Sequence, residues 1–317
     1  MADAPEKVSA PPKSLGEKLQ SIKRTTLFMI LILFTSIPLL IPGIKLPNRT
    51  DVPAQDIYKQ LMTIPEGSTV LIQSDWTNST RGESGGQFNA LIRILMRRHI
   101  RACIYTAADA QAPEVAKNAI LELNKQQTAA KLPTYDEWND WVHLGFFPSA
   151  EGTSVSIGTD VRKAFAGKKA TPPGGKKTDV FESPVLKDIH AVKDFPLMVV
   201  LTASNTSNVA IERLYGKVPL AMMVTGVMGP ETQVYYDSHQ LVGLSKGLKG
   251  VYDIENMMDD GATIGGTQFP AFKGPGIVNH DLGTLYYPTL HAALFLLIIA
   301  VVAGNVGMFL SRKGKSQ

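Results

Sequence analysis

Two long runs without a charged side chain, one near each end of the chain, constrain the fold more than any other feature. Residues 25–44 contain no charge, and residues 289–310 carry only His291 near one edge. A helix needs about 20 apolar residues to cross the hydrocarbon core of a bilayer, and both runs reach that length. No small-x-small cleavage site follows the first run, which favours an uncleaved anchor over a signal peptide. We therefore predict two transmembrane helices, with the lipid bilayer as a partner.

Basic residues flank the outer end of each apolar run. Lys23 and Arg24 precede the first run, and Arg312 and Lys313 follow the second. Because basic flanks stay in the cytoplasm, both termini are expected inside and the middle of the chain outside. The predicted organisation is a cytoplasmic basic tail over 1–24, transmembrane helices over 25–44 and 289–310, an extracytoplasmic domain over 45–288, and a second basic tail over 311–317.

The charge and cysteine content exclude several classes of function. The net charge is +4, and the excess of basic residues lies at the two termini. Such a small, terminal excess gives no reason to expect a nucleic acid as a partner. Cys103 is the only cysteine, so the chain contains neither an internal disulfide nor a cysteine-based metal site.

Small residues recur along the second apolar run. Small residues three or four positions apart let two helix backbones approach closely, and a neighbouring amide side chain can bond across the pair. The partner helix is either the first apolar run or another copy of the chain, which predicts a homo-oligomer or a membrane-protein complex. The residues concerned are Ala300, Ala303, Gly304, Asn305 and Gly307.

The middle of the chain alternates continuous apolar runs with helical patterns. Uninterrupted apolar runs are typical of parallel strands that helices cover on both faces. Alternation of such strands with helices predicts an α/β fold, a Rossmann-like doubly wound and mostly parallel sheet. The predicted strands are residues 69–74, 102–106, 196–203 and 219–226, with a weaker candidate at 141–147.

Polar loops follow three of these strands, at residues 74–86, 202–208 and 225–233. In doubly wound sheets, ligands bind beyond the carboxyl ends of the strands. The loops predict either a rim that binds a polar or anionic small molecule, or a solvated surface that binds nothing. No GxGxxG follows the first strand and no phosphate-binding GxxxxGK[ST] occurs, so no cofactor is predicted. The candidate rim residues are Ser74, Asp75, Thr77, Arg81, Gly85, Gly86, Ser204 and Asn205.

Residues 243–247 form the GxSxG pattern of a hydrolase nucleophile elbow. Ser245, Asp259 or Asp260, and His280 also follow the chain order of such a catalytic triad. However, few residues remain after the motif to build further strands, and no strand clearly precedes it. Leucines and glycines at helical spacing favour a packing helix over residues 241–255 instead. No HExxH or other metal-ligand spacing links the histidines, so no metal site is predicted.

Two stretches, "WVHLGFFPSAEGTSVSIGTDVRKAF" and "YYDSHQLVGLSKGLKGVYDIE", resemble a group of uncharacterised bacterial membrane proteins. In that group, two membrane helices flank an α/β domain. The resemblance covers about half of the middle domain. It implies a location in the cell membrane, no known reaction, and no required serine in the second stretch.

Together these patterns predict a membrane-anchored binding or assembly module that is not an enzyme. It would be oligomeric or part of a membrane complex. The alternative is a membrane-tethered serine hydrolase that uses the GxSxG motif. A third reading, a sensor that relays a signal through its helices, is opposed by tails too short to hold a signalling domain.

Overall fold

The chain divides into an α/β domain, Lys45–Tyr287, and a second unit made of the segments on either side of it. The structure is a computed structural model that describes residues 15–41, 44–205 and 208–313. The predicted tails over 1–24 and 311–317 therefore lie partly outside the described residues.

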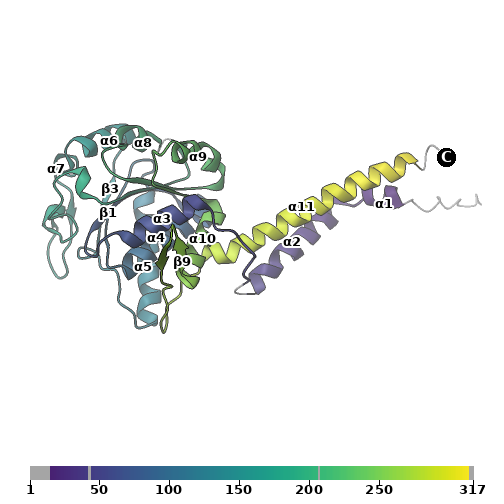
Figure 1. The fold of residues 1–317 in the computed structure, drawn as a ribbon, viewed down its shortest axis with the longest axis horizontal. Coiled ribbons are helices and arrows are strands. Elements are labelled where there is room, and N and C mark those ends of the chain that lie inside the picture. Colours follow the sequence, from purple (N-terminus) through teal and green to yellow (C-terminus); the bar gives the residue numbers. More distant parts are fainter. Residues whose placement is uncertain (1–14, 42–43, 206–207, 314–317) are drawn as a thin grey trace, which may run out of the picture. The chain divides into compact units, whose positions relative to one another are not determined.

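Six parallel strands form the central sheet of the described α/β domain (Figure 1). Their spatial order is β3-β2-β1-β6-β7-β8, so the chain builds outward from β1 in one direction and then restarts beside β1 in the other. This is the order of a doubly wound Rossmann fold, as the sequence predicted. The strands are β1 (Thr69–Asp75), β2 (Arg101–Thr106), β3 (Trp141–Phe146), β6 (Met198–Thr202), β7 (Leu220–Val224) and β8 (Gly243–Lys246).

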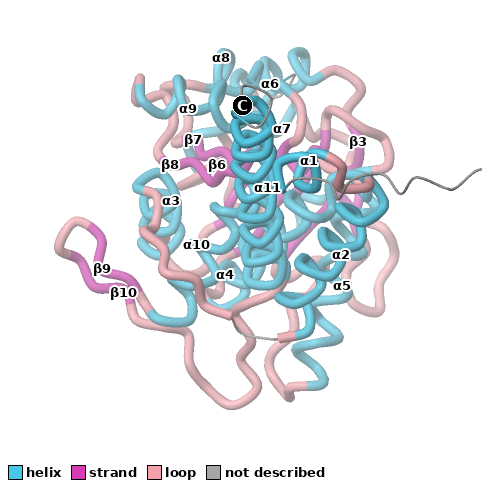
Figure 2. Tube along the Cα trace, turned by 90° about the vertical axis from the view of Figure 1, so that its right-hand side faces the viewer, coloured by secondary structure: helices cyan, strands magenta, loops and turns pink. Residues whose placement is uncertain are grey.

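Helices cover both faces of the sheet. The side chains of successive strand residues point to opposite faces, and since apolar side chains of the strands lie on both, both faces must be covered. Val70 and Ile72 of β1 belong to one core, and Leu71 between them belongs to the other. Figure 2 shows α4 between α10 and α5 on the first face. That face carries α3 (Val52–Thr63), α4 (Gly86–Arg97), α5 (Ala112–Ala129) and α10 (Gly247–Asp260), and the other carries α6 (Ala150–Thr159), α7 (Val161–Ala164), α8 (Asn208–Leu214) and α9 (Gly229–Asp237).

Short elements complete the domain. Two small antiparallel hairpins lie outside the main sheet, and single helical turns interrupt the loops. The hairpins are β4 (Lys169–Ala170) with β5 (Thr178–Asp179) and β9 (Ala262–Ile264) with β10 (Thr267–Phe269); the turns are η1 (Asn78–Thr80), η2 (Arg81–Gly85), η3 (Val180–Glu182), η4 (Val192–Asp194) and η6 (Gly226–Met228).

The predicted packing helix over residues 241–255 is right only for its second part, from Gly247 onward. Residues 243–246 form β8, and α10 begins only at Gly247, whose φ of +52° makes the turn between strand and helix. Gly243 has a second role, since a Cβ there would lie 2.5 Å from the backbone nitrogen of Ile57 in α3. Gly243 and Gly247 therefore mark a close approach of backbones and a turn, whereas Gly250 lies within α10, packed against Ser245 of β8 as a close helix–sheet approach requires.

The prediction of two membrane-length helices holds only for the second. Among the described residues, one helix is long and apolar enough to cross a membrane, Leu282–Arg312 of α11 (Leu282–Lys313). The first apolar run forms α2 (Arg24–Leu40), which has 17 residues. Such a helix is about 26 Å long, against about 30 Å for the hydrocarbon core. The helix ends early because Ile41, already extended, precedes a proline in the sequence, and such residues avoid the helical region.

A small-residue contact joins the two ends of the chain within the second unit. A Cβ at Gly307 would lie 3.1 Å from Cβ of Leu19 and 3.2 Å from the carbonyl oxygen of Gly16 in α1 (Leu15–Gln20). Gly304 has no such neighbour among the described residues. Ala303 is half-buried, and Ala300 and Asn305 are exposed. Association of α11 with another copy stays a prediction.

Candidate functional site

The loops after β1 and β7 meet beyond the carboxyl ends of the strands. Glu83 Oε2 accepts a hydrogen bond of 2.6 Å from the backbone N–H of Gly226, and Gln87 Nε2 donates one of 2.8 Å to the carbonyl oxygen of Val224. The neighbours β1 and β6 mark the point where the strand order reverses, which is where Rossmann folds bind ligands. In this protein, hydrogen bonds from the segment that follows β1 to the end of β7 and the loop after it close the crevice.

The Asp75 carboxylate forms its hydrogen bonds inside the protein, with β1 and with the end of β2 and the loop that follows it. Its side chain is buried at the end of β1, and Oδ1 accepts hydrogen bonds from Thr106 Oγ1 at 2.7 Å and from the N–H groups of Ala107 and Ala108 at 2.8 and 3.1 Å. Gln73 Nε2 donates to the other carboxylate oxygen at 2.5 Å. The carboxylate ties the β2–α5 loop to β1, so it acts as a turn anchor.

The other predicted rim residues are scattered. Ser74 is buried within β1. Thr77 shares a hydroxyl contact of 2.8 Å with Ser79. Gly86 packs on α10, where a Cβ would lie 3.1 Å from Val251 Cγ1.

On the β6 side, Ser204 N–H donates to Thr202 Oγ1 at 2.9 Å, and Asn205 is exposed. Residues 206–207 of that loop lie outside the described part. The structure does not gather these residues around one cavity.

Arg81 and Gly85 do share a cavity, together with other residues of the β1–α4 loop. A hollow of about 450 Å³ lies between α4 and α5, beside the start of α11. Its walls come from the β1–α4 loop, from Asn89 of α4, and from a face of α5 that carries both polar and apolar side chains. The lining residues are Trp76, Asn78, Arg81, Gly85, Asn89, Val115, Asn118, Ala119, Glu122, Leu123, Gln126 and Leu282.

A hydrogen-bond network lies at the end of this hollow. Arg93 is 3% exposed, and one of its terminal nitrogens donates to Gln126 Oε1 at 3.2 Å and to Asp281 Oδ2 at 3.1 Å. Asn89 Nδ2 donates to the same carboxylate oxygen at 2.9 Å. Asn89 and Arg93 are four residues apart and therefore share a face of α4. The network joins α4, α5 and the residue that precedes α11.

Ser245 is remote from the other members of the predicted triad. It is buried in β8, and a Cβ at Gly250 would overlap its hydroxyl oxygen. Asp259 comes twelve residues after Gly247 along α10, which places it about 18 Å further along the helix axis. The strand-to-helix context of a nucleophile elbow is present, but the serine is covered and the acid lies at the opposite end of the helix.

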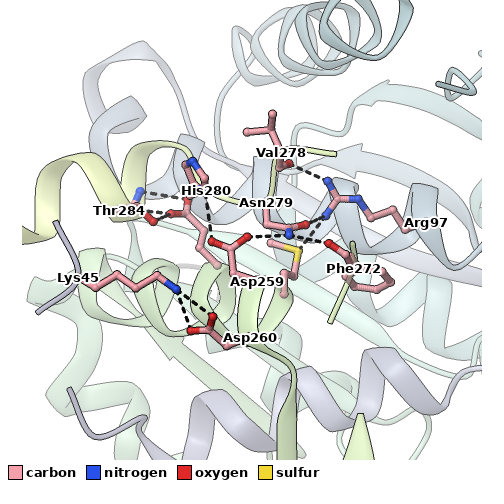
Figure 3. A network of polar contacts seen from close by, with 12 residues as sticks. Lys45, Arg97, Asp259, Asp260, Phe272, Val278, Asn279, His280 and Thr284 are labelled. Carbon is pink, nitrogen blue, oxygen red and sulfur yellow. Dashed lines mark hydrogen bonds and ion pairs between the residues drawn. The ribbon is translucent and has the colours of Figure 1, made fainter. Parts of the chain in front are cut away.

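Asp259 and His280 do approach each other, in a network that fastens the segment before α11 (Figure 3). Asp259 Oδ2 lies 3.1 Å from His280 Nδ1, and Asp259 Oδ1 accepts a hydrogen bond of 2.7 Å from Asn279 Nδ2. Arg97 of α4 donates to Asn279 Oδ1 and, at 2.7 Å, to the carbonyl oxygen of Val278. These bonds hold the extended segment against α4 and α10, which is a structural role.

Glu255 fixes the first turn of α11. Its buried carboxylate accepts hydrogen bonds from the N–H groups of Gly283 and Thr284, at 3.1 and 2.6 Å, and from Thr284 Oγ1 at 2.6 Å. Burial raises the pKa of Glu255, while the bonds from Thr284 and Gly283 oppose that rise. The first amides of a helix lack intrahelical partners, so a carboxylate there stabilises the helix start.

Sequence reasoning missed Glu255, Arg93, Asn89 and Asp281. For two of them the sequence did hold a signal, a charged side chain among the apolar positions of a helix. Glu255 lies among the apolar positions of α10, and Arg93 lies among those of α4. In the described residues, no three His, Cys, Asp or Glu side chains gather closely enough to hold a metal ion.

No protein-family model, curated protein or solved structure matches this chain significantly. The resemblance to a group of two-pass bacterial membrane proteins therefore stays a prediction.

Proposed function

We propose that this chain is a membrane-anchored binding or assembly module whose α/β domain lies outside the cytoplasm and carries out no catalysis. The observation that supports it best is α11. Its apolar stretch is only 6% buried, and its first turn is bonded into the α/β domain through Glu255. A long exposed apolar helix is unfavourable in water and favourable in a bilayer. The basic flanks of the two apolar runs support the proposed orientation.

The proposal includes α2 as a second membrane segment. Its 17 residues reach the lower end of the range of about 17–25 for a spanning helix. All of its large apolar side chains are at least partly exposed in the structure, as a bilayer or another helix would require. The glycine contact between α1 and α11 and the open side at Gly304 support association with a partner helix or a second copy.

Alkaline extraction of cell membranes tests the anchor. The wild-type chain should stay in the membrane pellet, whereas Leu297→Arg combined with Val301→Arg should release it, because each arginine costs about 2.5–3.5 kcal/mol at a helix centre. Val227→Arg is the matched control, since Val227 is 90% exposed in the α/β domain. Release of the wild-type chain would overturn the proposal.

Two further measurements test the other parts of the proposal. Cross-linking in membranes should trap a second copy or a partner protein, and purely monomeric behaviour would contradict assembly. A fluorophosphonate probe should leave Ser245 unlabelled. Labelling of wild type that disappears in Ser245→Ala would establish the hydrolase alternative.

A further inference from the structure

We propose that the hollow between α4 and α5 binds a small hydroxylated carboxylate, an acid of the sugar-acid type. The inference rests on the proposed function, because it names a ligand class for the same binding domain. It moves the expected site away from the closed crevice between β1 and β6, to the cavity that Arg81 and Gly85 line.

The charges around the hollow favour one carboxylate. Arg81 is exposed, and its side chain has no hydrogen bond or ion pair with any other described residue, although its backbone N–H bonds to the carbonyl oxygen of Asn78. The acids of its own loop are engaged elsewhere, Asp75 with the β2–α5 loop and Glu83 with Gly226. Glu122 on the wall pairs with Lys125 at 3.1 Å. One guanidinium therefore remains to bind a carboxylate through two parallel hydrogen bonds.

The walls favour hydroxyl groups on the rest of the ligand. Four amide side chains line the hollow, and an amide both donates and accepts hydrogen bonds, as a hydroxyl does. Two of these amides are already bonded within the protein through one atom each, Asn89 to Asp281 and Gln126 to Arg93, and a purely apolar ligand would leave the remaining amide groups without partners. The volume of about 450 Å³ is at the lower end for small-molecule sites, which suits a ligand of about 10–15 non-hydrogen atoms. The amides are those of Asn78, Asn89, Asn118 and Gln126.

Buried polar atoms in the walls support the same ligand. Trp76 Nε1, Asn89 Oδ1 and one terminal nitrogen of Arg93 have no hydrogen-bond partner among the described residues. Trp76 and Arg93 are each 3% exposed. Trp76 and Asn89 also line the hollow, and a hydroxyl is the ligand group that would donate to Asn89 Oδ1 and accept from Trp76 Nε1. Contacts to such unpaired groups discriminate strongly for a ligand that supplies the missing partner.

Calorimetric titration of the full chain in mild detergent tests the ligand class. Sodium gluconate is the probe, and glucose and hexanoate are the controls, since each has six carbons and lacks either the carboxylate or the hydroxyls. Gluconate should bind saturably with a Kd of about micromolar to millimolar order, and each control at least about tenfold more weakly. No saturable binding of gluconate, or equal binding of either control, would overturn the proposal.

Variants test the location. Arg81→Met keeps an unbranched apolar stem, removes the charge and should weaken gluconate binding by about tenfold or more. Lys163→Met, the matched control, makes the same charge change at an exposed position on α7 and should leave the Kd within about twofold. Equal effects of the two variants would contradict binding in the hollow. Both variants should keep the wild-type melting temperature.

The two proposals can fail separately. A chain that stays in the membrane pellet but does not bind gluconate keeps the anchored-module function and loses this ligand class. A chain that alkaline extraction releases loses the anchored-module function, whatever the titration gives.

Discussion

The crevice beyond β1 and the hollow between α4 and α5 are built in part from the same loop, yet they differ in how their polar groups are used. At the crevice, Asp75 and Glu83 bond to the backbone of neighbouring loops. At the hollow, the Arg81 side chain has no partner in the described part of the chain, and Asn89 keeps an unpaired oxygen. The crevice residues therefore contribute to stability, and the hollow residues are left for a ligand. Changes at the two places should separate these effects.

The largest effect is expected at Asp75. Asp75→Ala leaves the N–H groups of Ala107 and Ala108 and the buried Thr106 hydroxyl without their acceptor, and should lower the free energy of unfolding by about 3 kcal/mol. Urea unfolding followed by tryptophan fluorescence measures the loss. Asp109→Ala is the matched control, because its carboxylate is exposed and accepts from a single backbone N–H, so the cost should stay below about 1 kcal/mol.

Arg81→Met belongs to the same comparison and should change the free energy of unfolding by less than about 0.5 kcal/mol. If Arg81→Met destabilises the chain as much as Asp75→Ala, the hollow is part of the folding core and the contrast between the two regions is wrong.

A smaller effect is expected where β8 meets α10. Gly250→Ala places a methyl group against the Ser245 hydroxyl and should cost about 2 kcal/mol through overpacking. Ser245→Ala should be nearly neutral, and the double variant should recover part of the loss. Gly82→Ala is the control, since a Cβ there meets no described atom within 4 Å. Equal melting temperatures for Gly250→Ala and Gly82→Ala would contradict the close contact.

The last effect comes from pH, at a position outside both regions. His143 lies in the edge strand β3, where burial lowers its pKa to about 4, and its Nδ1 accepts a hydrogen bond of 2.9 Å from the N–H of Gly145. The folded protein keeps the imidazole neutral, whereas the unfolded chain takes up a proton near pH 6.5. The stability that depends on the neutral ring is therefore complete above pH 6.5 and is lost as the pH falls from 6.5 towards 4.

Since His143 is partly exposed, we expect a loss of about 1–2 kcal/mol over this range. Unfolding at pH 7.5 and 4.5 measures it, and His143→Gln should reduce the difference between the two pH values. An unchanged difference in His143→Gln would assign the pH dependence to another group.

The sequence predicted the layered fold well because buried parallel strands leave a strong local signal. The uninterrupted apolar runs marked β1, β2, β6 and β7, and the weaker run at 141–147 is β3. The sixth strand was missed because β8 has only four residues and includes two with low strand propensity. Gly243 lies where α3 approaches closely, and Ser245 packs against Gly250 of α10. A contact with a distant segment determined that element, and a local pattern cannot reveal it.

The candidate site was less predictable for the same reason. The sequence placed Arg81 and Gly85 in a loop that could bind a ligand, but it assigned that loop to the crevice with Ser204 and Asn205. Which side of the loop stays open depends on α5 and on Leu282, which are far apart in the sequence. Likewise, Ser245, Asp259 and His280 follow a catalytic order along the chain, while the length of α10 separates the serine from the other two.

The position of Cys103 in the middle of β2 has a practical consequence for spectroscopy. Its side chain is fully buried, and burial raises the pKa of the thiol, so thiol reagents will not modify the folded chain. Because the sequence contains no other cysteine, any cysteine introduced at an exposed position becomes the single reactive site. Lys176→Cys, at an exposed position in the loop between β4 and β5, would carry one fluorophore or spin label on an otherwise unmodified background. Labels at such a cysteine can show on which side of the membrane the position lies, and can measure the distance between two copies of the chain.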